Sequence, residues 1–205
     1  MNLDVEQIKK WMIYTNEQIQ QNKQYLTELD QAIGDGDHGV NMARGFHEVT
    51  LKMNETNYDD VSELMKDVAM TIMSKVGGAA GPLYGTAFLR LSKAWKEEQS
   101  IDHPTLANGF REAVEGIQQR GRARPGEKTL VDVWAAVFEY IENNPQIKTE
   151  ALRGVLRDAV ERTKEMIGTK GRAAYFKENS LGHIDPGAMS SYYVFQSLCD
   201  ILEGN

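Results

Sequence analysis

Apolar side chains recur every three to four residues along most of the chain, and polar residues fill the positions between them. Near the N-terminus, Val5, Ile8, Trp11 and Met12 follow this helical spacing. Alternating strand patterns are scarce, and two-residue hairpin turns between apolar runs are absent. The pattern therefore predicts one all-α domain, residues 1–205, built from about eight helices. After the N-terminal helix, we expect a helix that opens near His38 and others over residues 59–74, 87–99, 104–121, 130–143, 150–168 and 186–202.

Three aspartates lie within eight residues in the first break between helices. Asp30 ends one helix, and Asp35 and Asp37 follow in a turn punctuated by glycine. Oxygen ligands at this spacing suit a hard divalent cation such as Mg²⁺, which usually binds one or two carboxylates together with substrate phosphates. The segment is not an EF-hand loop, because the twelfth position is Phe46, where a bidentate Glu is required. Helix capping would explain one aspartate but not three, so the spacing favours a metal site.

The start of the next helix is a candidate anion site. Its first N–H groups have no partner within the helix, and His38 and Asn41 stand one turn apart there as donors for phosphate oxygens. A structural role for His38 is equally open.

Three later breaks carry glycine together with charged or small residues. In 77–82, GGAAGP, backbone amides could approach a ligand closely, although tight helix packing explains the glycines equally well. In 121–129, GRARPGEKT, a few positive charges could serve a phosphate ligand. Arg172 is either a phosphate clamp or a solvated surface residue. Asp185 precedes Pro186 and has the position of a helix N-cap.

Charge and cysteine content exclude several classes of protein. The net charge is −7 with no basic stripe, which argues against a nucleic-acid binder. The only cysteine, Cys199, lies in an apolar segment, so no internal disulfide is expected, and its simplest role is core packing. No apolar run approaches the ~18 residues of a membrane span, and the N-terminus does not have the pattern of a signal peptide. We therefore expect a cytoplasmic protein without a membrane anchor.

Taken together, the breaks resemble one family. Five segments carry the similarity, in this order: GDGDHGVNM, VGGAAGPLYGT, RGRARPGEKTLVDVW, KGRAAY and GHIDPGAMS. They are similar to the nucleotide-binding L subunit of bacterial dihydroxyacetone kinase, and the similarity extends from Asp30 to Ser191. The resemblance implies an antiparallel eight-helix barrel with a site for ADP or ATP and two Mg²⁺ in the loops at one end.

The resemblance also assigns site residues. It implies that Asp30, Asp35 and Asp37 bind the metals and act in catalysis through them. One feature departs from the family, since relatives often carry Ser or Thr where this chain has Ala79 and Ala80, so a hydroxyl contact to phosphate is missing. The nucleotide-binding residues implied are His38, Asn41, Gly78, Ala79, Ala80, Gly121, Leu130, Arg172, Asp185, Pro186 and Gly187.

In the resembling systems the acceptor and the donor come on other chains. A K subunit holds dihydroxyacetone, and a phosphohistidine-carrying M subunit of the phosphotransferase system rephosphorylates the bound ADP. The resemblance therefore implies a phosphotransferase subunit that acts only with these partners. Three alternatives stay open: a co-regulator that binds a transcription regulator according to nucleotide state, a kinase subunit for another short-chain ketose, and a metal-storage or scaffold domain. The oligomeric state is also open, with a homodimer among the alternatives.

Overall fold

A computed structural model describes residues 2–204 of the chain. Within these residues the chain forms nine α-helices, and strands are absent apart from one isolated bridge between Leu3 and Ile101. The helices are α1 (Val5–Gln21), α2 (Lys23–Ile33), α3 (His38–Glu55), α4 (Val61–Lys75), α5 (Ala80–Ala94), α6 (His103–Gly121), α7 (Leu130–Asn143), α8 (Thr149–Arg162) and α9 (Pro186–Leu202). Three short 3-10 helices, η1 (Thr163–Glu165), η2 (Arg172–Tyr175) and η3 (Lys177–Ser180), lie between α8 and α9. The all-α prediction is confirmed.

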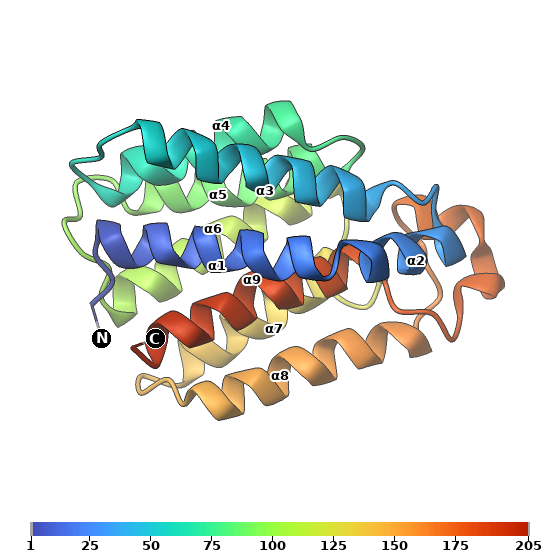
Figure 1. The fold of residues 1–205 in the computed structure, drawn as a ribbon. Helices are drawn as coiled ribbons and strands as arrows, with labels where there is room; N and C mark the ends of the chain where they lie inside the picture. Colours follow the sequence, from blue (N-terminus) through green and yellow to red (C-terminus); the bar gives the residue numbers. More distant parts are fainter. Residues whose placement is uncertain (1, 205) are drawn as a thin grey trace.

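The helices pack side by side in a closed ring (Figure 1). From α3 to α9 each helix packs against the next, α9 packs against α1, and α1 and α2 pack against α3. The helix predicted at the N-terminus is interrupted at Asn22, and α2 continues the path of α1. Because α1 and α2 together occupy one position in the ring, nine helices produce the eight-membered arrangement that the sequence predicted.

The core of this ring is apolar and rich in aromatic rings. Trp134 lies at its centre and packs edge-on against Tyr84, Phe88, Phe110 and Phe195, with ring centroids 4.7–6.3 Å apart. The cluster of buried apolar side chains includes members of all nine helices. Burial of this apolar surface is the main force that holds the helices together, and it leaves the loops at the two ends available for other roles.

Three helix boundaries differ clearly from the prediction, and one of them is the end of α5, which lies at Ala94 rather than at residue 99. The glycine-rich stretch expected to be irregular up to Thr86 is mostly helix, since α5 already begins at Ala80. The long helix expected up to Gly168 ends at Arg162, and 3-10 turns follow. Among residues 2–204, no helix has the length and apolarity needed to cross a membrane.

Candidate functional site

Four helices begin at the same end of the ring and surround one cavity. The walls of this cavity include residues at the N-termini of α3, α5, α7 and α9, together with part of η2. Backbone N–H groups in the first turn of a helix have no intrahelical partner, and the helix dipole makes that end positive. A site formed by four such ends favours an anionic ligand.

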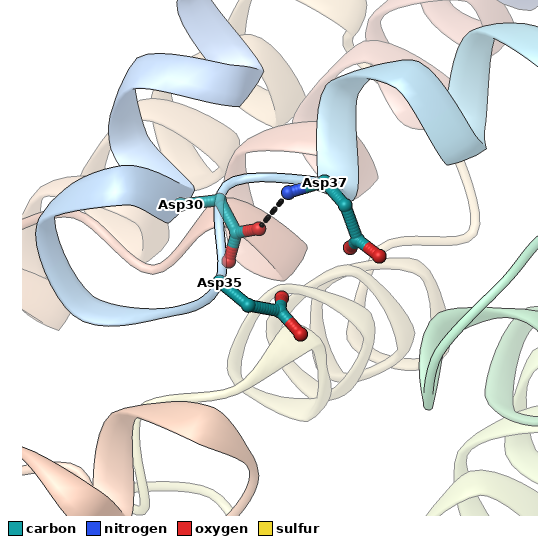
Figure 2. Close-up of side chains that lie close together, drawn as sticks. All are labelled: Asp30, Asp35 and Asp37. Carbon is teal, nitrogen blue, oxygen red and sulfur yellow. Dashed lines mark hydrogen bonds between the residues drawn. The ribbon is translucent and has the colours of Figure 1, made fainter.

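Three carboxylates face one another at the edge of this cavity (Figure 2). Asp30 comes from α2, and Asp35 and Asp37 come from the turn that leads into α3. Each can offer an oxygen such that the three oxygens lie within 4.8 Å of one another. Asp30 is buried, whereas Asp35 and Asp37 are exposed. Carboxylate oxygens at this separation repel one another unless a cation lies among them, and they are the donors that Mg²⁺ prefers.

Besides belonging to the carboxylate cluster, Asp30 caps the N-terminus of α3. Its Oδ2 accepts hydrogen bonds from the backbone N–H groups of Asp37, at 2.8 Å, and His38, at 3.0 Å. Asp37 occupies the N-cap position but makes no capping bond with its own side chain, so that carboxylate stays available to a ligand. Gly34 makes room for the arrangement, since a Cβ there would lie 2.0 Å from Oδ1 of Asp30. The capping alternative weighed from the sequence thus applies to Asp30 rather than to Asp35 or Asp37.

The ring of His38 points into a buried polar network beneath the aspartates. Its Nε2 lies 2.9 Å from the hydroxyl of Ser190, and Tyr84 contacts both Ser190 and Ser191 at 2.7 Å. Burial lowers the pKa of His38, while the nearby carboxylates of Asp30 and Asp37 act in the opposite direction. The network fixes the imidazole between α3 and the first turn of α9.

Residues 76–80, the turn after α4 together with the first residue of α5, form the opposite wall and are named the phosphate turn after the role that the resemblance implies. Gly78 has a φ of +65°, which glycine adopts without strain. The N-cap residue of α5, Ala79, makes no side-chain cap, so the first amides of α5 are free for a ligand. A Cβ at Gly81 would lie 2.2 Å from the carbonyl oxygen of Val76, and its absence keeps the turn tight.

Lys128 is a fully buried lysine in the cavity wall that the sequence analysis did not single out. Its ammonium group donates to the carbonyl oxygens of Thr163 and His183, which ties the loop before α7 to the segment before α9. Burial lowers its pKa, opposed by the charges of Asp185 and Asp132. The sequence did contain a signal for a functional role of Lys128: it lies in the Gly/Pro-containing segment 121–129 between two helices of an acidic chain.

Asp185 caps α9, as the sequence predicted. Its Oδ2 accepts from the N–H of Ala188 at 2.7 Å, and its own N–H donates to Thr163 at 3.1 Å. Burial raises its pKa to about 7, and the charges of Asp132 and Asp30 act in the same direction. Arg172 closes the far side of the cavity, where Nη2 contacts Oδ2 of Asp35 at 2.6 Å.

A second, largely apolar cavity adjoins the first. Ala79, Leu83, Thr129 and Leu130 line both, and Gly121 lines only the second. Pro82, Ile117, Ala123 and Val131 complete its apolar lining. The two cavities adjoin through these shared residues: the first contains the three aspartates, and the second is lined mainly by apolar side chains, with Arg120 and Lys170 also in its lining.

Most of the site residues expected from the sequence come together here. Asn41 lines neither cavity, because its amide lies beneath the phosphate turn against Gly77. Besides Lys128, the sequence analysis missed Leu83, Thr129 and Lys170. Twelve of the fourteen expected residues line the first cavity: Asp30, Asp35, Asp37, His38, Gly78, Ala79, Ala80, Leu130, Arg172, Asp185, Pro186 and Gly187.

Comparison with known proteins places the chain in a family. Residues 32–200 match the model of the DAK2 domain. The chain is 45% identical over 200 residues to the PTS-dependent dihydroxyacetone kinase, ADP-binding subunit DhaL, of Lactococcus lactis, which covers 98% of this chain and 99% of that protein. It is 43% identical over 198 residues to the PEP-dependent dihydroxyacetone kinase 1, ADP-binding subunit DhaL, of Listeria innocua, with 97% of each chain covered.

A solved structure has the same fold. The dihydroxyacetone kinase from C. freundii in complex with AMP-PNP and Mg²⁺ superposes with a TM-score of 0.77 at 19% identity, over 98% of this chain and 34% of that one. At this identity the likeness concerns the fold alone, while the family match rests on sequence. The chain therefore belongs to the DAK2 domain family.

Proposed function

We propose that the chain is the nucleotide-binding phosphotransferase subunit of a dihydroxyacetone kinase and that it binds ADP or ATP with two Mg²⁺. One observation carries the proposal: three facing carboxylates stand in a cavity that adjoins a second, mainly apolar cavity. A nucleotide has the same division between a charged phosphate chain and a flat base. The printed names of the relatives, ADP-binding subunits of dihydroxyacetone kinases, support this assignment.

The aspartates suit the metal by their chemistry. Asp30 is held in place by two backbone N–H groups through Oδ2, and the space beside Oδ1 is kept open by Gly34. Asp35 and Asp37 supply exposed carboxylates from a glycine-containing turn. Bound Mg²⁺ would neutralise the phosphate oxygens and the carboxylates at once.

The rest of the site offers groups for the nucleotide. The free amides at the start of α5 suit the phosphate oxygens, whereas the amides of Asp37 and His38 are already capped by Asp30. Arg172 adds a positive charge on the other side of the cavity. We place the base in the second cavity, between Leu83, Gly121 and Leu130, and Pro186 and Gly187 beside the phosphates.

The chain's own residues then bind and orient rather than react. We propose that the phosphoryl group passes from a phosphohistidine-carrying M subunit to the bound nucleotide, and from there to dihydroxyacetone held on a K subunit. In-line transfer of this kind depends on positioning and on neutralisation of charge, with no protein nucleophile. The phosphate turn does so with backbone amides, because Ala79 and Ala80 bring no hydroxyl groups. The cytoplasmic location expected from the sequence stays a prediction.

The direct test is to identify what the purified chain retains and what binds it. We expect native mass spectrometry to find ADP in stoichiometric amount, and calorimetry to show Mg²⁺-dependent ADP binding that Asp35→Asn or Asp37→Asn abolishes. Asp59→Asn is the matched control, because Asp59 is an exposed aspartate in the loop before α4, at the opposite end of the ring. Unchanged ADP affinity in both site variants would refute the proposal.

A transfer assay separates the kinase role from a purely regulatory one. With K and M subunits, phosphoenolpyruvate and the phosphotransferase-system proteins that phosphorylate M added, the kinase role requires phosphorylated dihydroxyacetone to form. Glyceraldehyde and a four-carbon ketose serve as competing acceptors. Retained nucleotide without transfer to any of these acceptors would favour the regulatory alternative.

A further inference from the structure

Arg44 lies outside the cavity but joins two elements of the proposed site. It is in the second turn of α3, and its Nε donates to the carbonyl oxygen of Lys75 at 2.8 Å. Lys75 is the last residue of α4, directly before the phosphate turn. The last carbonyl groups of a helix have no intrahelical partner, and a guanidinium is a suitable donor for them. Arg44 therefore ties the start of the phosphate turn to α3.

The same guanidinium also fixes the orientation of a buried amide. Nη2 of Arg44 donates to Oδ1 of Asn41 at 2.7 Å, and Asn41 is only 7% exposed. An arginine has donors only, so the amide atom that it contacts must be the oxygen. The NH₂ group of Asn41 is thereby left free to donate elsewhere.

That amide lies directly against the phosphate turn. A Cβ at Gly77 would lie 2.9 Å from Oδ1 and 3.0 Å from Nδ2 of Asn41. Gly77 itself lines the cavity, while Asn41 does not. The phosphate turn can therefore lie this close to the side-chain amide of Asn41 only because residue 77 is glycine. Arg44 fixes the orientation of that amide, because it binds the oxygen Oδ1 and leaves the NH₂ group for another partner.

We propose that Arg44 is a positioning residue for nucleotide binding, acting by holding the Asn41 amide in one orientation beneath the phosphate turn. The inference rests on the proposed function, because the turn matters only if a phosphate-bearing ligand binds it. Arg44 touches neither the ligand nor the metal in this role. Its effect is transmitted through Asn41, while the hydrogen bond to the carbonyl of Lys75 holds the guanidinium in place.

A double-mutant cycle tests whether Arg44 acts through Asn41. Calorimetry would measure the affinity for ADP in saturating Mg²⁺ for the wild-type chain, Arg44→Met, Asn41→Ala and the double variant. Loss of one well-placed hydrogen bond corresponds to about a tenfold change, so we expect Arg44→Met to weaken ADP binding about tenfold. In the Asn41→Ala background the same change is expected to weaken binding by less than about twofold.

Arg111 provides a matched control. It stands in the same relation to Asn108, three residues earlier on α6, with 3.5 Å between Nη1 and Oδ1, and it also pairs with Glu142 near the far end of α7. Arg111→Met removes an arginine–asparagine contact of the same spacing, longer and exposed, away from the site and is expected to leave ADP affinity unchanged. Thermal unfolding of the ligand-free variants reports any general loss of stability separately.

The outcomes are distinct. If Arg44→Met binds ADP like the wild-type chain, or weakens binding equally with and without Asn41, the inference is overturned while the proposed function stands. If the wild-type chain binds no ADP, the proposed function fails and this inference fails with it. Should Arg44→Met not fold, Arg44→Lys replaces it in the cycle, since one ammonium cannot reproduce both donor contacts, and an intermediate loss is then expected.

Discussion

Arg172 and Asp35 form an ion pair across the mouth of the site, with 2.6 Å between Nη2 and Oδ2. Arg172 belongs to η2, and Asp35 belongs to the turn between α2 and α3. Asp35 is also one of the three carboxylates that we assign to the cation. A guanidinium and a metal ion compete for the same oxygen, because each neutralises it at contact distance. The pair is therefore expected to open when metal and nucleotide bind.

Arg172→Met should have opposite effects on metal and on nucleotide. Removing the competing guanidinium frees Asp35, so we expect Mn²⁺ alone, used as a probe for Mg²⁺, to bind a few-fold more tightly. The effect is small because the side chains are 63% and 40% exposed, and exposed ion pairs contribute little. ADP with Mg²⁺ should bind more weakly, because a positive charge near the phosphates is lost. Electron paramagnetic resonance of Mn²⁺ and calorimetry with ADP measure the two affinities.

Lys177→Met is the control for Arg172→Met. Lys177 is an exposed cation in the neighbouring η3, so its removal changes the net charge equally without touching Asp35. Changes of the same sign in both affinities of Arg172→Met would contradict the competition.

The aspartate cluster was predictable because its geometry is local. Asp35 and Asp37 are two residues apart in one turn, and Asp30 ends the preceding helix, so the spacing alone indicated a shared ligand. The different roles of the three carboxylates could not be predicted from the spacing. Asp30 caps α3 because the chain reverses between α2 and α3 and brings its carboxylate to the amides of Asp37 and His38, which depends on the three-dimensional path of the turn.

The glycines of α5 show why the helix boundary was missed. Gly81 and Gly85 look like breaks, yet both lie within α5. A Cβ at Gly85 would lie 2.2 Å from Cγ of Met73 on α4, so this glycine permits close packing of α4 and α5. Pro82 is tolerated because the first turn of a helix needs no N–H donor. Partners in tertiary packing cannot be read from a single sequence, and the same limit concealed the carbonyl contacts of Lys128.

Gly34→Ala should damage both the fold and the metal site. The new Cβ would lie 2.0 Å from Oδ1 and 2.8 Å from the carbonyl oxygen of Asp30, so the carboxylate that caps α3 must move. We expect the free energy of unfolding to fall by about 1–3 kcal/mol and Mn²⁺ binding to be lost. Urea denaturation and Mn²⁺ titration measure the two effects.

Gly154→Ala is the matched control for this substitution. Gly154 lies within α8, and a Cβ there meets no atom within 4 Å. Alanine has the higher helix propensity, so this variant should gain about 0.5–1 kcal/mol in unfolding free energy and keep the metal affinity. If Gly34→Ala binds Mn²⁺ as tightly as the wild-type chain, metal binding by the aspartates does not require the space beside the carboxylate of Asp30.

Asp185 makes the stability of the ligand-free chain depend on pH in a direction unusual for an aspartate. Its ordinary pKa is 3.8, and burial raises the pKa in the folded chain to about 7. Between these two values the unfolded chain has released the proton and the folded chain retains it. Because the unfolded state then binds fewer protons, this group's contribution to stability decreases as pH rises from about 4 to about 7.

Asp185→Asn should remove that dependence while keeping the helix cap, because an asparagine oxygen can also accept the N–H of Ala188. Urea denaturation at several pH values between 4.5 and 7.5 should show the variant gaining stability relative to the wild-type chain as pH rises, by at most about 1.4 kcal/mol per pH unit. Asp102→Asn is the control, since Asp102 caps α6 through Thr105 but is exposed, and its hydrogen bonds to Thr105 lower its pKa. The contribution of Asp102 is present above its ordinary pKa and is lost only below it, so its variant should differ from the wild-type chain by a constant amount in this range. If the Asp185→Asn and wild-type curves also run parallel, Asp185 is ionised in the folded chain throughout, and Lys128 compensates its charge.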